Sequence, residues 1–267
     1  MSRRVLVTGA GSGLGKALAA RFAAGGDRVL VTDVDTAAGE AVAAALGQSF
    51  LRLDITSDES WEAAREWCER EWGGLDVLVN NAGVGAAGRV ERIPMADWDW
   101  ILEINIKGVV RGCRTFIPGF KAQGSGHIVN VASLAAIMKL PAMGSYNVTK
   151  AGVLALSETL RYELEPYGIG TTVVCPAFFP TNLNDRLRSP DKAAAELSVK
   201  LMQSTSLTAE QVASQVYDAV GARRFLVLSR GDAVRAARLK RFLPRLVDAQ
   251  VRRYWARLRP RLDREEA

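Results

Sequence analysis

The feature that most constrains the fold is a glycine-rich turn that follows an apolar run near the N-terminus. Val5-Leu6-Val7 leads into Thr8-Gly9-Ala10-Gly11-Ser12-Gly13-Leu14-Gly15, and residues 16–24 continue with a helical pattern. Glycines let the backbone turn tightly, and a helix N-terminus presents free N–H groups that attract phosphate. A strand, a glycine turn and a helix in this order predict a dinucleotide-binding unit. For this element alone, a turn without a ligand remains an alternative.

Apolar runs of strand type alternate with helical patterns along the rest of the chain. We expect further strands at 28–32, 49–53, 75–79, 126–133, 170–175 and 225–228, and helices at 37–46, 59–72, 98–116 and 146–167. This alternation predicts an α/β fold: a Rossmann-like, doubly wound parallel sheet of about seven strands with helices on both faces. At 267 residues and without a linker, we expect one domain over residues 1–230, with residues 182–207 as a lid.

Asp33 follows the second predicted strand, where a carboxylate can accept hydrogen bonds from the adenosine ribose. A 2′-phosphate there would meet a like charge. Ser12 rather than a basic residue precedes Gly13, and no Arg follows Asp33. The pattern favours NAD over NADP, although a polar residue that only closes a strand is the alternative.

Tyr146 and Lys150 are four residues apart, so they share one face of the predicted helix. A nearby ammonium favours the phenolate, and we expect the pKa of Tyr146 to fall below its usual value of about 10. Ser133, at the C-terminal end of a strand, and Asn105, between two isoleucines in a helix, are polar groups that need partners. Taken alone, Tyr146 and Lys150 could also be a chance pair on a surface helix.

Other chemistries have little support in the composition. The three cysteines are scattered, the only histidine is His127, and we expect no metal site and a structural role for His127. No run of about 18 apolar residues suggests a membrane span, and only eight residues precede the glycine turn, so we expect a cytoplasmic protein.

Together these motifs resemble the short-chain dehydrogenase/reductase family in its compact one-domain branch. The resemblance is carried, in order, by Thr8-Gly9 with Gly13 and Gly15, Asp54, Asn80-Asn81-Ala82-Gly83, Asn105, Ser133, Tyr146 with Lys150, and residues 176–181. It implies hydride transfer between a nicotinamide and an alcohol or carbonyl carbon. Tyr146 would exchange the proton, Ser133 would hold the substrate oxygen, Lys150 would lower the pKa of Tyr146, and Asn105 would anchor a relay water.

The resemblance also implies a set of cofactor contacts. These are Gly9, Ser12, Gly13, Leu14 and Gly15 for the pyrophosphate, Asp33 for the adenosine ribose, Asp54 and Ile55 for adenine, and Asn81, Ala82, Gly83, Tyr146, Lys150, Pro176 and Thr181 for the nicotinamide half. Ala177 stands where the family usually has Gly, which adds a methyl group near the nicotinamide.

The segments expected on the substrate side are apolar: Val84, residues 134–141, Met143 and residues 178–179. The candidate substrate contacts within them are Leu134, Leu140, Met143, Phe178 and Phe179. They predict a hydrophobic alcohol or ketone, lipid-like, steroid-like or aromatic. The resemblance further implies a homodimer or homotetramer that associates through the helices at 98–116 and 146–167. A dinucleotide-binding sensor or scaffold and a membrane-recruited interaction protein are the alternatives to an enzyme.

The C-terminal residues 231–267 form a basic, amphipathic extension. From residue 223 onward there are fourteen Arg and Lys against five Asp and Glu, whereas residues 1–222 carry a net charge of −3. Leu239, Phe242 and Leu243 have helical spacing, and Pro244 should divide two helices. A peripheral membrane contact, packing on a neighbouring subunit and packing on the chain's own core all fit. We expect no nucleic acid partner, since the basic run lacks a known binding fold.

Overall fold

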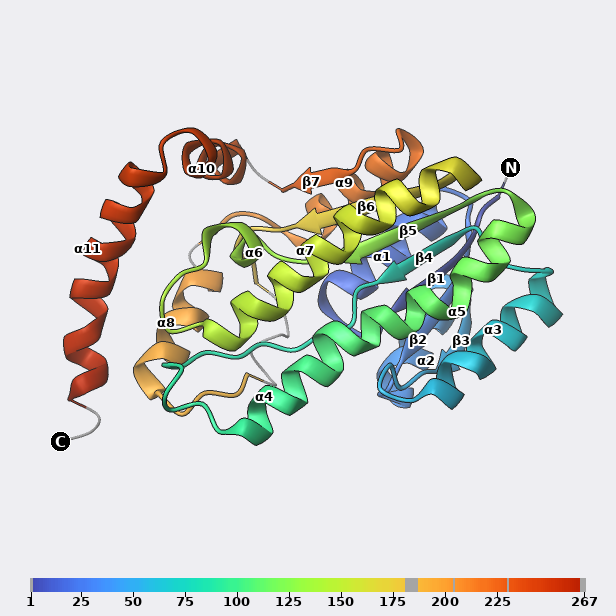
Figure 1. The fold of residues 1–267 in the computed structure, drawn as a ribbon. Helices are drawn as coiled ribbons and strands as arrows, with labels where there is room; N and C mark the ends of the chain where they lie inside the picture. Colours follow the sequence, from blue (N-terminus) through green and yellow to red (C-terminus); the bar gives the residue numbers. More distant parts are fainter. Residues whose placement is uncertain (1, 181–186, 204, 230, 265–267) are drawn as a thin grey trace.

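The computed structural model describes residues 2–180, 187–203, 205–229 and 231–264. Thr181 and residues 182–186 of the predicted lid therefore lie outside the described part. Within it, seven parallel strands form one sheet in the order β3-β2-β1-β4-β5-β6-β7 (Figure 1). The strands are β1 Arg4–Thr8, β2 Arg28–Asp33, β3 Ser49–Arg52, β4 Val77–Asn80, β5 Gly126–Val131, β6 Ile169–Cys175 and β7 Leu226–Leu228. The predicted Rossmann-like doubly wound α/β sheet is confirmed.

Alternate strand residues supply the two faces of the sheet. Val5, Val7 and Val79 pack against α1 (Gly13–Ala24), α2 (Thr36–Leu46) and α9 (Ala209–Gly221). Leu6 and Leu78 point the other way, toward α3 (Asp58–Trp72), α5 (Gly108–Gln123) and α7 (Gly144–Leu164). These strands are buried on both faces, as is usual for a parallel sheet. The strand order reverses between β1 and β4, and such a point is where open α/β sheets bind ligands.

The predicted helix at 98–116 is longer than expected and is not regular throughout. It runs as α4 (Met95–Leu102), a π-helical segment at Glu103–Lys107 and then α5. The helix continues through Pro118 and ends at Gly124, whose φ of 67° closes it. The π-helical turn has Asn105 at its centre, and such turns often occur at functional sites.

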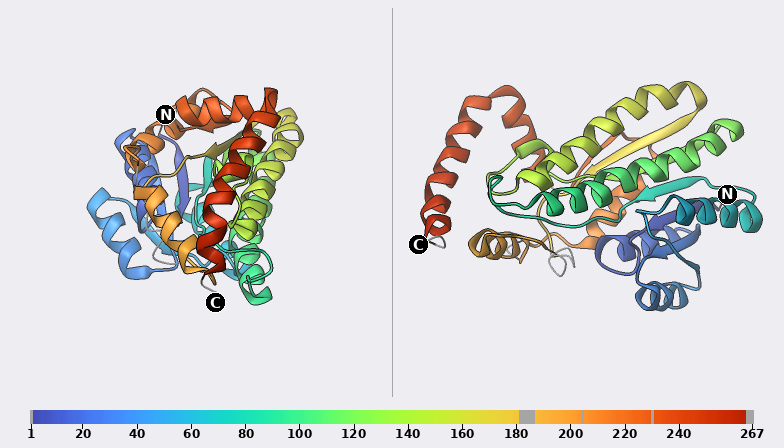
Figure 2. Two further views of the ribbon diagram at one scale, coloured as in Figure 1. Left: turned by 90° about the vertical axis from the view of Figure 1, so that its left-hand side faces the viewer. Right: turned by 60° about the horizontal axis from the view of Figure 1, so that its bottom comes forward.

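Four helices lie near the sheet edge at which the strands end: α6 (Ala135–Met138), α8 (Lys192–Gln203), α10 (Gly231–Phe242) and α11 (Pro244–Asp263). The described part of the predicted lid therefore contains one regular helix, α8. Pro244 begins α11 and separates it from α10, as its fixed φ predicts. Figure 2 shows α11 standing away from the sheet, near α8. None of the described helices is long and apolar enough to cross a membrane.

Candidate active site

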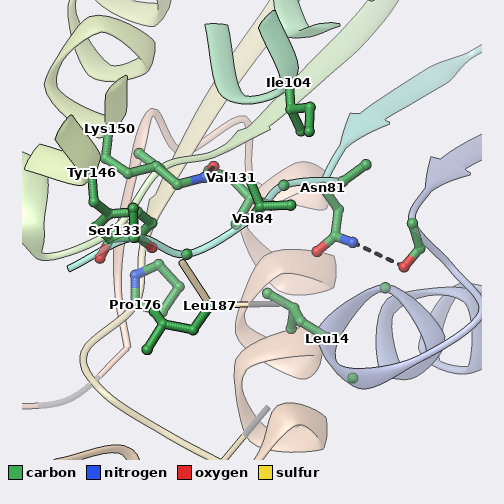
Figure 3. A pocket seen from close by; sticks show the side chains of 18 of the residues that line it. Leu14, Asn81, Val84, Ile104, Val131, Ser133, Tyr146, Lys150, Pro176 and Leu187 are labelled. Atoms are coloured by element: carbon green, nitrogen blue, oxygen red, sulfur yellow. Dashed lines mark hydrogen bonds between the residues drawn. The ribbon is translucent and has the colours of Figure 1, made fainter. Parts of the chain in front are cut away.

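A cavity of about 1190 Å³ opens at the carboxyl ends of the strands. One end is formed by the loops that follow β1, β2, β3 and β4. The other end is formed by α4, α6, α8, α10 and the first turns of α7. Figure 3 shows Tyr146, Lys150 and Ser133 grouped on one side, and Leu14 and Asn81 on the other. Every predicted site residue that the structure describes lines this cavity, except Asn105, which lies behind it.

The glycine turn fits a bound pyrophosphate. α1 begins at Gly13, and its N-cap residue Ser12 makes no side-chain hydrogen bond to the first amides. Those N–H groups are therefore free to face an anion. Gly9 has a φ of 64°, a Cβ at Gly9 would lie 2.9 Å from the Ala82 Cα, and a Cβ at Gly15 would overlap the Gly9 carbonyl. Only glycine fits at these two positions.

Thr8 connects the glycine turn to the loop after β4. Its hydroxyl accepts hydrogen bonds from the backbone N–H groups of Asn81 and Ala82, each at 3.0 Å. The Asn81 Nδ2 donates in return to the Thr8 carbonyl at 2.8 Å. Thr8 is missing from the predicted contacts, although its place at the end of β1 pointed to this edge. These bonds hold the glycine turn and the loop after β4 at a fixed separation.

The predicted adenosine end of the cavity is acidic. Asp33 accepts hydrogen bonds from the Gly11 amide at 2.8 Å and the Asp35 amide at 3.0 Å, so it also supports the glycine turn. Asp54 accepts from the amide and the hydroxyl of Thr56, which lower the pKa of its carboxyl. Asp35 lines the same end. Among the described residues that line the cavity, Lys150 is the only one with a basic side chain.

Tyr146 lies in the first turn of α7 and is buried. Burial raises the pKa of Tyr146 to about 12, and a hydrogen bond with the Ser133 side chain opposes this rise in part. The expected fall of the pKa below 10 is therefore wrong for the protein's own groups. The cause is desolvation, which penalises a phenolate more than the surrounding groups stabilise it.

Lys150 is the group beside Tyr146 whose pKa moves toward neutrality. Its Nζ donates to the Val131 carbonyl at 3.1 Å and lies 5.8 Å from the centre of the Tyr146 ring. Burial lowers the pKa of Lys150 to about 8. A Cβ at Gly83 would lie 3.4 Å from this Nζ, so the loop after β4 approaches the lysine closely. The lysine can thus gain and lose a proton near physiological pH.

Asn105 positions the loop that borders the site. It is fully buried; its Oδ1 accepts from the Val84 N–H at 2.8 Å and its Nδ2 donates to the Val84 carbonyl at 2.9 Å. The same Nδ2 lies 3.3 Å from the Thr149 hydroxyl on α7. Asn105 therefore ties the π-helical turn to the loop and to the helix that carries Tyr146. Its predicted role in a water relay stays a prediction.

His127 lies at the opposite end of β5 from Ser133. It is buried, its Nε2 is 2.8 Å from the Thr172 hydroxyl on β6, and burial lowers its pKa to about 4. This placement supports the structural role expected for it. The described residues contain no cluster that could hold a metal ion.

The substrate end is lined by all five residues predicted from the sequence, Leu134, Leu140, Met143, Phe178 and Phe179. Val84 and Met138, from the expected segments, and Leu187 and Met202, from the predicted lid, also line it. Trp100, Ile104 and Ala236 were not predicted. Asn147 adds a polar group: its Nδ2 donates to the Leu140 carbonyl at 2.8 Å, and its buried Oδ1 has no partner in the described part of the chain. No motif marks these residues, because they come from separate helices and loops.

The outer wall of the substrate end is fastened by a buried carboxylate. Asp191, which is fully buried, accepts from the Arg89 backbone at 2.8 Å and lies 3.1 Å from the guanidinium groups of Arg89 and Arg92. Arg89 also lies 3.3 Å from Asp263 on α11. Leu262, fully buried, packs in the same wall. The segment before α8, the loop after β4 and the C-terminal helix therefore meet at one point.

The fold and the site define a dinucleotide-binding α/β protein in which a half-buried Ser133 lies beside a buried tyrosine and lysine. A model of the short chain dehydrogenase family matches residues 3–192, and the chain belongs to this family. A 2-(R)-hydroxypropyl-CoM dehydrogenase from Xanthobacter autotrophicus is 34% identical over 81% of this chain and 90% of its own length. A Burkholderia phymatum short chain dehydrogenase/reductase, solved in complex with NAD, is 32% identical, with a TM-score of 0.86 over 92% of this chain and 95% of that one.

The similarity to one further relative covers only part of that protein. The probable oxidoreductase EphD from Mycobacterium tuberculosis is 40% identical over 186 residues, which are 67% of this chain and 31% of EphD. This chain therefore spans about a third of that relative's length. The matched segment corresponds in size to the residues that the family model covers.

Proposed function

We propose that this chain catalyses hydride transfer between NAD(H) and a hydrophobic secondary alcohol or ketone. The observation that carries the proposal is the position of Ser133, Tyr146 and Lys150, between a cradle that fits a dinucleotide and an apolar chamber. The bound nicotinamide would supply the hydride acceptor for an alcohol, or the hydride donor for a ketone. The protein would supply position and the proton.

The proton would pass through the buried Tyr146 hydroxyl. Ser133 would hold the substrate oxygen beside the Tyr146 hydroxyl. In reduction, Tyr146 would give its proton to the forming alkoxide, and the charged form of Lys150, with a pKa lowered to about 8, would replace it. In oxidation, the alcohol proton would pass to Tyr146 as the Tyr146 proton passes on to the neutral form of Lys150. Asn105 would keep the π-helical turn and α7 in register, and it would anchor the relay water.

The preference for NAD is supported by the acidic adenosine end. Asp33, Asp35 and Asp54 lie there, and a 2′-phosphate would add a like charge. We expect tighter binding of NADH than NADPH in parallel fluorescence titrations. Asp33→Ser should narrow the difference between the affinities for NADH and NADPH. Equal affinities for the two cofactors in the unchanged protein would contradict the NAD preference.

The substrate class is supported by the residues that face Tyr146 across the chamber. They are apolar apart from a few groups such as Asn147 and Ser198, so affinity should come mainly from hydrocarbon burial. The Xanthobacter relative is named as a dehydrogenase of a 2-hydroxypropyl compound, which is a secondary alcohol, and this fits the same reaction class. In a panel of alcohols and polyols, kcat/KM should rise with hydrocarbon size, and faster turnover of polyols would contradict this assignment.

Tyr146→Phe tests the reaction itself. We expect turnover to fall by about 100-fold or more, because the proton donor is lost, while NADH affinity stays unchanged. Tyr217→Phe, on α9 and outside the cavity lining, is the matched control and should keep full activity. If the unchanged protein binds NADH but turns over no alcohol or ketone, the sensor or scaffold interpretation replaces this one.

We also propose that subunits associate through the helix α4–α5 and through α7. Val148 is 51% exposed and Tyr162 is 69% exposed on α7, which leaves apolar surface on this helix for a partner. The molar mass from light scattering should be a multiple of 28.9 kDa. A monomer at micromolar concentration would contradict the association.

A further inference from the structure

The turn between α10 and α11 exposes apolar side chains, whereas other apolar residues of the C-terminal extension are buried. We call residues 241–246 the elbow; its sequence is Arg-Phe-Leu-Pro-Arg-Leu, and all six residues are exposed. Phe242 is 71% exposed, Leu243 51% and Leu246 53%. Val247 and Leu258, in contrast, are buried. The extension thus has one face packed on its own chain and a separate apolar projection at the elbow.

The elbow lies within the most basic part of the molecule. Residues 231–264 contain eleven Arg and Lys against three Asp, and one of these, Asp263, already pairs with Arg89 and Arg259. Arg241 and Arg245 are exposed and form no ion pair within the described part of the chain. Arg241 lies over the Phe242 ring, 5.6 Å from its centre. Positive charge therefore directly flanks the exposed apolar group.

We propose that the elbow docks the protein on an anionic membrane surface. Phe, Leu and Leu at the tip of a helical turn can enter the boundary between headgroups and acyl chains, while the adjacent guanidinium groups meet lipid phosphates. A nucleic acid would pair with the arginines but leave the apolar tip in water. The combination of charge and exposed hydrocarbon fits a bilayer better than a polyanion alone.

The elbow is close to the substrate end of the cavity. Ala236, one turn and a half earlier on α10, lines the cavity, and the Lys240 Nζ donates at 3.1 Å to the carbonyl of Met138, which also lines it. In Figure 1 the turn lies at the side of the molecule opposite α2 and α3. Docking would therefore bring the apolar chamber near the bilayer, a consequence that rests on the proposed hydrophobic substrate.

The test uses the full chain and co-sedimentation with phosphatidylcholine vesicles, with and without phosphatidylglycerol, at physiological ionic strength. We expect binding only to the anionic vesicles. Replacing Phe242, Leu243 and Leu246 together with Ser should weaken partition by about tenfold or more, and Arg241→Glu with Arg245→Glu should do the same. Met95→Ser, at a residue that is also 71% exposed, and Arg70→Glu on α3 are the matched controls.

Several outcomes would overturn the proposal. These are no binding of the unchanged protein to anionic vesicles, equal binding of the elbow variants, or retention on duplex DNA without vesicle binding. A change of molar mass in the Ser variant without vesicle binding would assign the elbow to a second copy instead. Because all substituted residues are exposed, unchanged circular dichroism should show that the variants fold.

A second measurement separates this proposal from the proposed function. The elbow variants should turn over a long-chain secondary alcohol dissolved in the vesicles more slowly than the unchanged protein does. They should turn over a short water-soluble alcohol at the unchanged rate. If the unchanged protein turns over neither alcohol, the proposed function fails while vesicle binding still decides the docking. If it turns over both equally well with and without the elbow, delivery from the bilayer is excluded.

Discussion

The two ends of the cavity are built in different ways. The cofactor end uses loops that follow successive strands, and its critical contacts involve backbone: the Gly15–Gly9 approach, the Thr8 hydroxyl on two amides, and the Asp33 carboxylate on the Gly11 amide. The substrate end uses side chains from separate helices and loops, and the ion pairs of Asp191 hold its outer wall. Backbone geometry tolerates few residue types, whereas side-chain packing tolerates many. Within one fold, this difference lets the substrate end vary while the cofactor end stays the same.

The largest effect should come from Gly15→Ala at the cofactor end. The added methyl group would overlap the Gly9 carbonyl, so the turn would have to open and the pyrophosphate cradle would be lost. We expect NADH affinity to fall by about 100-fold or more, equivalent to roughly 3 kcal/mol. Gly119→Ala in α5 is the control, since nothing lies within 4 Å of its Cβ position. If Gly15→Ala kept its NADH affinity, the glycine turn could accommodate a methyl group, and the strict backbone requirement at the cofactor end would be wrong.

Asp191→Asn should act mainly at the substrate end. The change leaves the Arg89 guanidinium, with only 9% of its side chain exposed, without its buried counter-charge. We expect a loss of roughly 3 kcal/mol in the free energy of unfolding, and a higher KM for the alcohol with unchanged NADH affinity. Chemical denaturation and steady-state kinetics would measure both. Glu62→Gln, in an exposed pair with Arg65, should leave both quantities unchanged, and a parallel loss of NADH binding would contradict the separation of the two ends.

Lys150→Met tests the point where the two ends meet. Because the pKa of Lys150 is lowered to about 8 in the folded chain, the charged form is penalised there relative to the unfolded chain. The penalty is fully present below pH 8 and disappears as pH rises toward the unfolded value of 10.5. Lys150→Met should therefore abolish turnover yet raise the free energy of unfolding by roughly 1–3 kcal/mol at pH 7. The gain in the free energy of unfolding should vanish above pH 10.5. A variant less stable than the unchanged protein at pH 7 would contradict the penalty assigned to burying the charged lysine.

The residues that could be predicted from the sequence are those that the sheet places. Asp33, Ser133 and the glycines follow strands, and the carboxyl ends of parallel strands share one edge, so their proximity followed from the strand assignments. Lys150 followed from its spacing to Tyr146. The direction of the Tyr146 pKa did not follow, because spacing shows that a cation is near but does not show how completely the phenol is buried.

Residues such as Trp100 and Ala236 could not be predicted. Each is an ordinary apolar residue on a helix, and only the packing of that helix brings it to the cavity. The same limit applied to the C-terminal extension. Its periodicity indicated an apolar face, but whether a given residue of that face is buried depends on what packs opposite it. In the structure Leu258 is buried and Phe242 is exposed.

The ion pairs of Arg89 have a consequence for the order of assembly during synthesis. Arg89 is separated by 102 residues from Asp191 and by 174 residues from Asp263. A chain that emerges from the ribosome N-terminus first holds its glycine turn and the first four strands long before these partners exist. We therefore expect the nascent chain to pair its first four strands early and to close the outer wall later, once the segments that carry Asp191 and Asp263 have been synthesised.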